Sequence, residues 1–257
     1  MGGSLIKGLI RCGVPTDLIT ASDKDPGICN DIREKYGIDT YLSNKEAIDK
    51  AQVVILAVKP QHIVEVLEEI RDSVTKDKLV ISIVAGVSTA AIEEHLTKGV
   101  PVIRVMPNSP AFVKASMSAL SEGKNVSGEQ METAKEIFDS AGRSVIVDES
   151  LQNAVTALSG SGPAYFYLVV EALTEAGVDS GMDWDTAFTL AHETMFGASR
   201  MLKMTGMKPQ ELIDMVKSPG GTTEAAMNVF DEDGLKSLIK KAFEAARGRA
   251  GELEIKD

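Results

Sequence analysis

The fold is decided by the stretch VVILAVKP at residues 53–60. Its first six residues are apolar, and four of them are β-branched. A continuous apolar run of this kind is typical of a strand that is buried on both faces, as in a parallel sheet. Lys59 and Pro60 end the run, because proline cannot continue the ladder of an inner strand. The stretch therefore predicts an inner parallel strand followed by a polar loop.

Similar apolar runs lie on both sides of this strand and alternate with helical patterns. Strands that alternate with helices of ordinary length imply right-handed crossover connections and a doubly wound α/β sheet. The first half of the chain thus predicts a nucleotide-binding domain. The predicted strands are residues 18–21, 79–83, 102–105, 118–120 and 144–147, and the predicted helices are residues 27–36, 63–74, 89–96 and 128–141.

The second half of the chain has a different pattern, without a convincing strand from Gln152 onward. Long helical periodicities replace the alternation, which predicts an all-helical second domain. We place the boundary near Glu149, giving domains at residues 1–149 and 150–257. The predicted helices of the second domain are residues 164–177, 183–205, 208–217, 224–230 and 235–253.

The chain opens with MGGSLIKGL, which predicts a helix that begins at once. A doubly wound sheet normally opens with a central strand and a Gly-x-Gly-x-x-Gly turn. The opening matches what remains of such a turn without its strand and first two glycines, and Gly2 is then the third glycine. We therefore expect an incomplete chain that lacks the first strand. The alternative is an ordinary flexible N-terminus.

Composition excludes several classes of function. The 257 residues carry a net charge of −11, which disfavours nucleic acid and anionic lipid as partners. Cys12 and Cys29 are too few for a disulfide scaffold, and the three histidines share no metal-ligand spacing. No apolar run is long enough to span a membrane, and no signal peptide is visible. We expect a cytoplasmic protein without a metal site.

Three loops that follow predicted strands are candidates for ligand binding, because ligands of open α/β sheets bind at the carboxyl ends of strands. Residues 57–60 lie at the carboxyl end of the apolar run at residues 53–58, although Pro60 at the start of a helix is also a common structural stop. The cluster Ser22-Asp23-Lys24 offers a carboxylate for a ribose or a lysine and serine for a 2′-phosphate, and its alternative is a solvated turn. Asn108, in the rigid loop of residues 104–110, offers a donor and an acceptor; its alternative is a turn residue.

Two glycine-containing turns mark the helical half. Residues 159–164 (SGSGPA) allow close backbone approach, which suits tight packing as well as ligand contact. Residues 218–223 (SPGGTT) open a predicted helix, where free N–H groups and the helix dipole favour an anion such as a carboxylate. The alternative for the second turn is a connection between helices with threonine as N-cap.

Taken together, the motifs resemble the pyrroline-5-carboxylate reductase family. The matching stretches are AVKPQ at 57–61, MPNSP at 106–110, ALSGSGPAY at 157–165 and SPGGTT at 218–223. Each is weak alone, but the set at these separations is highly specific, and the resemblance extends from Gly2 to about Leu253. It implies an NAD(P)-binding Rossmann-like domain, with its first strand apparently missing, followed by an all-α substrate-binding and dimerisation domain.

The resemblance implies an enzyme that reduces 1-pyrroline-5-carboxylate to L-proline with NADPH or NADH, the last step of proline biosynthesis. It implies a homodimer or higher oligomer that assembles through the helical domain. Thr223 would face the ring nitrogen as the catalytic residue, able to orient or relay a proton without being a strong acid. The implied substrate-binding residues are Ser218, Gly220, Gly221, Thr222 and Thr223, and the implied cofactor-binding residues are Gly2, Ser22, Lys24, Asn44, Ala57, Val58, Lys59, Pro60 and Asn108.

Two departures and two alternatives accompany this interpretation. Besides the missing strand, residues 114–116 (KAS) stand where the family usually has glycines, which changes the expected loop geometry. One alternative is another NAD(P)-dependent imine or hydroxyacid oxidoreductase, for which Lys203 is the one candidate catalytic lysine. The other is a cofactor-impaired chain that serves only as an assembly module.

Overall fold

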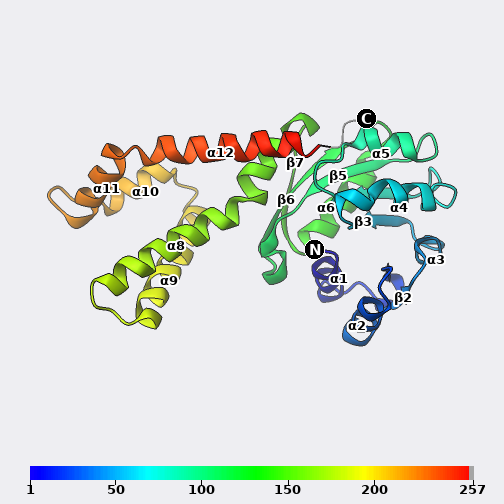
Figure 1. The fold of residues 1–257 in the computed structure, drawn as a ribbon, viewed down its shortest axis with the longest axis horizontal. Helices are drawn as coiled ribbons and strands as arrows, with labels where there is room; N and C mark the ends of the chain where they lie inside the picture. Colours follow the sequence, from blue (N-terminus) through cyan, green and yellow to red (C-terminus); the bar gives the residue numbers. More distant parts are fainter. Residues whose placement is uncertain (255–257) are drawn as a thin grey trace. The chain divides into compact units, whose positions relative to one another are not determined.

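The computed structural model describes residues Met1 to Glu254, which form two compact units (Figure 1). Unit 1 comprises Met1–Ser161 together with the chain from Ala246 onward, and unit 2 comprises Gly162–Ala245. The expected helical domain extends to residue 257, and residues 255–257 lie outside the described residues. No helix of the described residues is both long and apolar enough to cross a membrane.

Unit 1 contains seven strands and most of the short elements. Its strands are β1 (Thr20–Ser22), β2 (Asp39–Tyr41), β3 (Val53–Leu56), β4 (Leu79–Ser82), β5 (Val102–Met106), β6 (Ser116–Glu122) and β7 (Gly142–Ile146). Its α-helices are α1 (Gly2–Arg11), α2 (Pro26–Tyr36), α3 (Asn44–Ile48), α4 (Ile63–Ile70), α5 (Thr89–His95), α6 (Gly128–Asp139) and α7 (Gln152–Val155). Single turns of 3₁₀-helix occupy Thr16–Leu18, Pro60–His62, Ser109–Val113 and Glu149–Leu151, and Thr156–Gly160 is a π-helix.

The main sheet has the order β3-β4-β5-β6-β7. β3 pairs parallel to β4 and β4 parallel to β5, with Val54 opposite Val80 and Val80 opposite Val102. β5 and β6 are antiparallel, and the sequence analysis predicted no helix between these two strands. Residues 107–115 connect them, and so short a link cannot carry the crossover that a parallel pair requires. Within this link Lys114 adopts a left-handed φ of 60°, a conformation that favours glycine.

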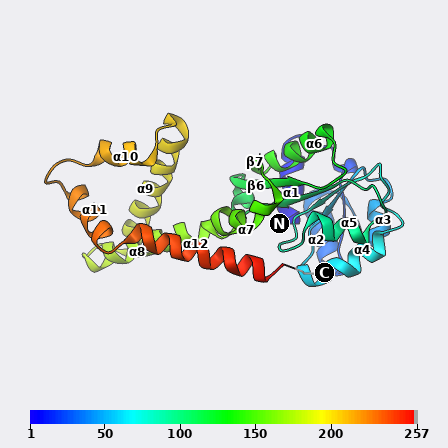
Figure 2. The same cartoon turned by 90° about the horizontal axis from the view of Figure 1, so that it is seen from above.

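Each face of the main sheet carries its own apolar core, so the unit has an α/β/α arrangement (Figure 2). On one face, Val80 and Val102 pack with residues of α4 and α5 such as Leu67 and Ile92. On the other face, Ile81 and Ile103 pack with residues of α1 and α6. Neighbouring residues of one strand point to opposite faces. The continuous apolar runs in the sequence therefore supply both cores, as predicted.

A second, two-stranded sheet pairs β1 with β2 in parallel. β1 and β3 are both edge strands, and no hydrogen-bonded strand joins them among the described residues. The doubly wound order has a central strand at this position. α1 begins at Gly2, as expected for the first helix. The sequence analysis did not predict β2, α3 or α7, each of which has only three to five residues.

Unit 2 is helical throughout its described length. Asp183 caps α9 by accepting a hydrogen bond from the Thr186 backbone, and bonds to Thr186 lower the pKa of this carboxyl group. Gly177 permits close approach of α8 and α9, since a methyl group there would lie 2.9 Å from Ala187 Cβ. The helices are α8 (Gly162–Asp179), α9 (Trp184–Thr205), α10 (Pro209–Val216), α11 (Thr222–Glu232) and α12 (Leu235–Glu252), of which α12 continues into unit 1.

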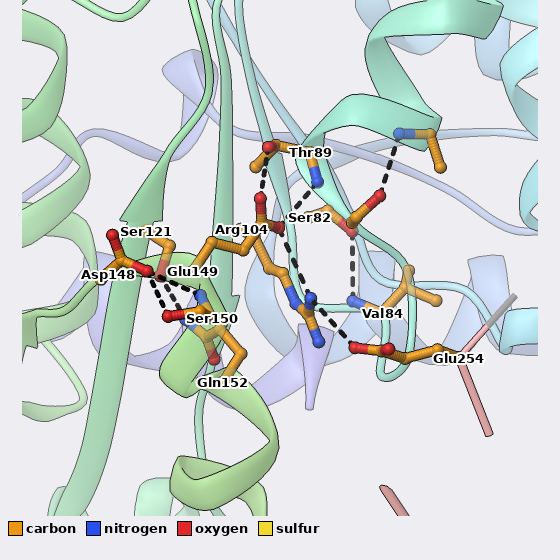
Figure 3. A network of polar contacts seen from close by, with 12 residues as sticks. Ser82, Val84, Thr89, Arg104, Ser121, Asp148, Glu149, Ser150, Gln152 and Glu254 are labelled. Atoms are coloured by element: carbon orange, nitrogen blue, oxygen red, sulfur yellow. Dashed lines mark hydrogen bonds and ion pairs between the residues drawn. The ribbon is translucent and has the colours of Figure 1, made fainter. Parts of the chain in front are cut away.

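The first compact unit extends twelve residues beyond Glu149, to Ser161. A buried arginine of unit 1 contacts Glu149 and Glu254, the acidic residues that flank residues 150–161 and the end of α12. Arg104 in β5 is 5% exposed and lies 3.4 Å from Glu149 Oε1 and 4.0 Å from Glu254 Oε1 (Figure 3). Glu149 also accepts hydrogen bonds from the backbone N–H and the hydroxyl of Thr89, at 2.8 and 2.6 Å. Gly86 allows the Leu253 backbone to approach closely, because a methyl group on Gly86 would lie 2.6 Å from the Leu253 carbonyl oxygen.

We expect Glu149→Gln to destabilise the protein by about 2 kcal/mol at neutral pH, because it leaves the buried Arg104 guanidinium without its nearest carboxylate. The cost stays below that of a fully buried pair, since the Glu149 side chain is 27% exposed. Urea denaturation measures the difference. Glu252→Gln, which changes an exposed ion pair with Arg249, is the control and should shift stability by less than about 0.5 kcal/mol. Equal stabilities of the two variants would contradict this role for Glu149.

Candidate active site

The first group of candidate residues gathers at the carboxyl ends of β1 and β3 in unit 1. The loop of residues 57–60 directly follows β3, and Ala57 and Lys59 are exposed there. Gly2, the first residue of α1, lies beside this loop, since a methyl group on it would be 3.5 Å from Ala57 Cβ. Pro60 opens a 3₁₀ turn. The structure thus brings Gly2 and Ala57 together, with the positive end of the α1 dipole near the loop.

Ser22 and Asn44 meet at the end of β1. The Ser22 hydroxyl donates a hydrogen bond of 2.8 Å to Asn44 Oδ1. Glu69 of α4 holds Asn44 in turn, accepting from its backbone N–H at 3.1 Å and from Nδ2 at 2.6 Å. Sequence reasoning missed Glu69, because it is one of several acidic residues on an amphipathic helix. Only the fold shows which of them turns toward the site.

Lys24, the basic candidate of the same loop, is exposed. Its neighbours shape the turn: the Asp23 side chain accepts from the backbone N–H of Asp25 at 3.0 Å, and Asp25 caps α2 by accepting from Gly27 at 2.8 Å. These carboxylates therefore have local structural roles. The lone pairs of the Ser22 hydroxyl and the first N–H groups of α1 are groups of the kind that can meet a ribose and a phosphate, whereas both ends of the Asn44 amide are engaged with Ser22 and Glu69.

Asn108 is placed differently from the other cofactor candidates. Its side chain is buried, and its Oδ1 accepts from the Met117 backbone at 2.9 Å and from the Ser116 hydroxyl at 3.2 Å. Its Nδ2 donates to the Ser159 carbonyl at 3.0 Å. Both ends of the amide are thus used within the protein. This geometry favours the alternative that Asn108 holds the loop after β5 in place.

The turn at residues 159–164 forms the end of a π-helix and the start of α8. The Ser161 N–H donates to the Thr156 carbonyl at 2.8 Å, closing the wide turn. Gly160 lies close to Met106, since a methyl group there would be 2.6 Å from Met106 Cε, and the end of the methionine side chain would have to move. π-Helical turns of this kind are frequent at functional sites. Here the small residues serve close packing within unit 1, the alternative that the sequence left open.

The second group of candidates, the turn Ser218 to Thr223, lies in unit 2 between α10 and α11. Gly220 has a left-handed φ of 71°, and the Gly221 N–H donates to the Ser218 carbonyl at 3.0 Å. Gly221 is the N-cap of α11, so threonine is not the capping residue. Among the described residues, neither Thr222 nor Thr223 uses its hydroxyl in a hydrogen bond with protein. The turn leaves the hydroxyls and the first N–H groups of α11 available to a ligand.

Glu224 is a residue of this turn that sequence reasoning missed. Its Oε2 accepts a 2.8 Å hydrogen bond from the Gly220 N–H, and its Oε1 lies 3.5 Å from Lys217 Nζ. The hydrogen bond from Gly220, and secondarily the charge of Lys217, lowers the pKa of Glu224. The carboxylate thus holds Gly220 in its left-handed conformation. The spacing of four residues between Gly220 and Glu224 at a helix N-terminus is the signal that could have found it.

Other titratable groups do not form a competing site. No group of three His, Cys, Asp or Glu side chains within residues 1–254 could hold a metal ion. His62 lies 3.9 Å from Glu65, and His192 packs its ring against Phe188. Lys203, the candidate of the hydroxyacid alternative, is exposed in the last turn of α9.

Comparison with known protein families matches each half of the chain to a different family description. Residues 149–253 match the family described as pyrroline-5-carboxylate reductase dimerisation, and residues 1–86 match that described as NADP oxidoreductase coenzyme F420-dependent. A pyrroline-5-carboxylate reductase of Methanosarcina acetivorans is 42% identical over 254 residues, which cover 98% of this chain and 94% of the relative. One from Pseudomonas aeruginosa is 40% identical and is covered to 93%.

Solved structures extend the similarity to the fold. A pyrroline-5-carboxylate reductase structure from Coxiella burnetii is 38% identical, covers 99% of this chain and 95% of its own, and has a TM-score of 0.95. The Plasmodium falciparum pyrroline carboxylate reductase with NADP bound is 27% identical, with coverage of 99% and 95% and a TM-score of 0.88. Prephenate dehydrogenase from Aquifex aeolicus, 15% identical with a TM-score of 0.56, shares the fold alone. The chain belongs to the pyrroline-5-carboxylate reductase family.

Proposed function

We propose that this protein reduces 1-pyrroline-5-carboxylate to L-proline with NADPH or NADH, the last step of proline biosynthesis. The observation that carries the proposal is the turn Ser218 to Thr223. It combines a left-handed glycine, the N-terminus of an eleven-residue helix and two threonine hydroxyls without protein partners. Such a turn suits a small substrate with one carboxylate beside a ring nitrogen. Family membership supplies the substrate class.

Unit 1 would hold the nucleotide. Ser22 would meet the adenosine ribose, with Asn44 beside it near the cofactor and Lys24 near a 2′-phosphate, and the start of α1 at Gly2 would face the pyrophosphate. The loop of residues 57–60 would line the nicotinamide side. When bound, the reduced nicotinamide supplies the hydride. In this assignment Asn108 keeps the loop after β5 in position, since its Oδ1 accepts two hydrogen bonds and its Nδ2 donates one within the protein.

Unit 2 would hold the substrate. The N–H groups of Thr222 and Thr223 in the first turn of α11 would bind its carboxylate, with Ser218, Gly220 and Gly221 forming the wall of the turn. Glu224 keeps Gly220 in shape and adds a negative charge, which Lys217 partly compensates. The Thr223 hydroxyl would bond the ring nitrogen, orienting the protonated imine or relaying a proton from water. A protonated imine is a far better hydride acceptor than a neutral one, so the site needs alignment and exclusion of water more than a strong acid.

The reaction is tested by oxidation of NADPH and of NADH by the purified chain with 1-pyrroline-5-carboxylate, followed by absorbance of the reduced nicotinamide. We expect turnover with the imine, formation of proline, and no turnover with small hydroxyacids in the reverse direction with the oxidised nucleotides. Lys203→Ala should leave the rate unchanged, because that side chain is exposed on α9. Oxidation of a hydroxyacid without proline formation would replace this function by the hydroxyacid alternative.

Thr223→Ala should lower kcat by roughly 10- to 100-fold, because the ring nitrogen loses the hydroxyl that orients or protonates it. Thr223→Ser keeps the hydroxyl and should retain most of the rate. The thermal transition of both variants should stay close to that of the natural chain, since the Thr223 hydroxyl makes no hydrogen bond with protein among the described residues. Steady-state kinetics of Thr223→Ala that match the natural chain would remove Thr223 from the mechanism.

We further propose that the protein works in the cytoplasm as a homodimer or higher oligomer assembled through unit 2. Large apolar side chains are exposed along its helices to an extent that is unusual for an isolated domain. A second copy would bury them, consistent with the match of this region to a dimerisation family. Examples on α8, α9 and α12 are Phe166, Leu168, Leu190, Phe196 and Leu238, each at least 54% exposed.

Sedimentation velocity should therefore give a mass at least twice that of the 27.4 kDa chain at micromolar concentration. Phe196→Asp, which puts a charge among these side chains, should shift the protein toward monomer. Glu193→Gln on the same helix changes an exposed polar residue and should leave the assembly intact. A natural chain that sediments as a monomer at this concentration would contradict the proposed assembly.

A further inference from the structure

The carboxylate of Glu69 has two hydrogen-bond donors, and both belong to Asn44. Glu69 Oε1 accepts from the Asn44 backbone N–H at 3.1 Å, and Oε2 accepts from Asn44 Nδ2 at 2.6 Å. The contact is partly buried and links α4 to the start of α3. A carboxylate that accepts twice from one residue fixes both its backbone and its side chain.

This contact decides which end of the Asn44 amide faces the ribose loop. An ionised carboxylate can only accept hydrogen bonds, so the NH₂ group of Asn44 must point at Glu69. The opposite end, Oδ1, then faces Ser22, whose hydroxyl lies 2.8 Å away. The assignment of oxygen and nitrogen in the amide follows from the chemistry of Glu69.

The direction of the amide in turn decides what Ser22 can offer a ligand. A serine hydroxyl has one proton, and here that proton is donated to Asn44 Oδ1. Ser22 Oγ therefore presents lone pairs at the carboxyl end of β1. Lone pairs accept from a ribose 2′-hydroxyl, which is a donor, whereas the oxygens of a 2′-phosphate are acceptors only.

We propose that Glu69, acting through Asn44 and Ser22, is a positioning residue that shifts cofactor preference toward NADH and away from NADPH. The proposal rests on the proposed function to the extent that the ligand of this loop is a nicotinamide nucleotide. Lys24, exposed on the same loop, acts in the opposite direction by attracting a phosphate. Glu69 sets a component of the preference that is independent of Lys24.

Glu69→Gln tests the proposal, because a glutamine amide can accept from Asn44 with one end only. The Asn44 side chain is then free to turn and donate Nδ2 to Ser22, which releases the serine proton to a 2′-phosphate. The dissociation constants of NADH and NADPH are measured by fluorescence titration of the full 257-residue chain without substrate. We expect the dissociation constant of NADPH divided by that of NADH to fall by on the order of fivefold, which corresponds to the net free energy of one hydrogen bond.

Glu68→Gln is the matched control, an exposed neighbour on the same helix, and should leave the ratio unchanged. In a Ser22→Ala background the ratio should no longer respond to Glu69→Gln, because the proton it redirects is absent. An unchanged ratio in folded Glu69→Gln protein would overturn the proposal. So would a full shift that persists in the Ser22→Ala background, since the effect would then bypass the serine.

The titration separates this proposal from the proposed function. Nucleotide binding does not use the imine, so a chain that shows the expected shift without turning over 1-pyrroline-5-carboxylate would overturn the reaction and support the role of Glu69. Turnover of 1-pyrroline-5-carboxylate together with an unchanged ratio in Glu69→Gln would support the reaction and overturn the role of Glu69. A natural chain that binds neither nucleotide would overturn both.

Discussion

Parallel pairing of β3, β4 and β5 is the constraint on which the candidate site in unit 1 depends. Parallel neighbours need a crossover between them, so their carboxyl ends meet at one edge and both faces are covered by helices. The two apolar cores follow from this arrangement, since alternate residues of the same strand enter different clusters. In the loop of residues 57–60 at the carboxyl edge, Val58 packs against one core, whereas Ala57 and Lys59 are exposed. The candidate ligand-binding residues thus lie at the carboxyl ends of the strands, and residues within the same strands form the two cores.

Hydrogen-bond satisfaction separates the polar residues that hold the fold from those that can meet a ligand. Asn108 and Glu149 have every described contact directed at the protein itself, and each joins segments that are distant in sequence. Their positions near strand ends resemble those of binding residues, but a buried group whose partners are already present has little left for a ligand. Ser22 differs, because its proton is engaged while its lone pairs remain available. The polarity of a site is therefore set partly by residues that never touch the ligand, as Glu69 illustrates.

The turn before α11 shows the same logic with backbone groups. A helix N-terminus and two threonine hydroxyls supply the attraction for an anion, and Gly220 supplies a conformation that other residues avoid. Glu224 stabilises that conformation from within the helix, and its carboxylate then lies beside the proposed site for the substrate carboxylate. Lys217 offsets part of this charge. The hydrogen bond from Gly220 and, to a smaller extent, the charge of Lys217 lower the pKa of Glu224. The turn is preorganised, so a bound carboxylate would not have to order it.

The sequence by itself determined the elements and the positions of the loops. Six of the strands and nearly all long helices were predicted within a few residues, because apolar runs and helical periodicity are local signals, and the fold class and family followed from motifs in a fixed order. It also located Ser22, Asn44, residues 57–60 and the turn before α11 as candidates. Tertiary structure alone decided the antiparallel joint at β6, the short elements β2 and α3, and the return of residues beyond Ala245 to unit 1. It alone revealed the roles of Glu69, Arg104 and Glu224. Their partners are other side chains and backbone groups brought close by folding, and a carboxylate on a helix carries no local mark of which amide it will meet.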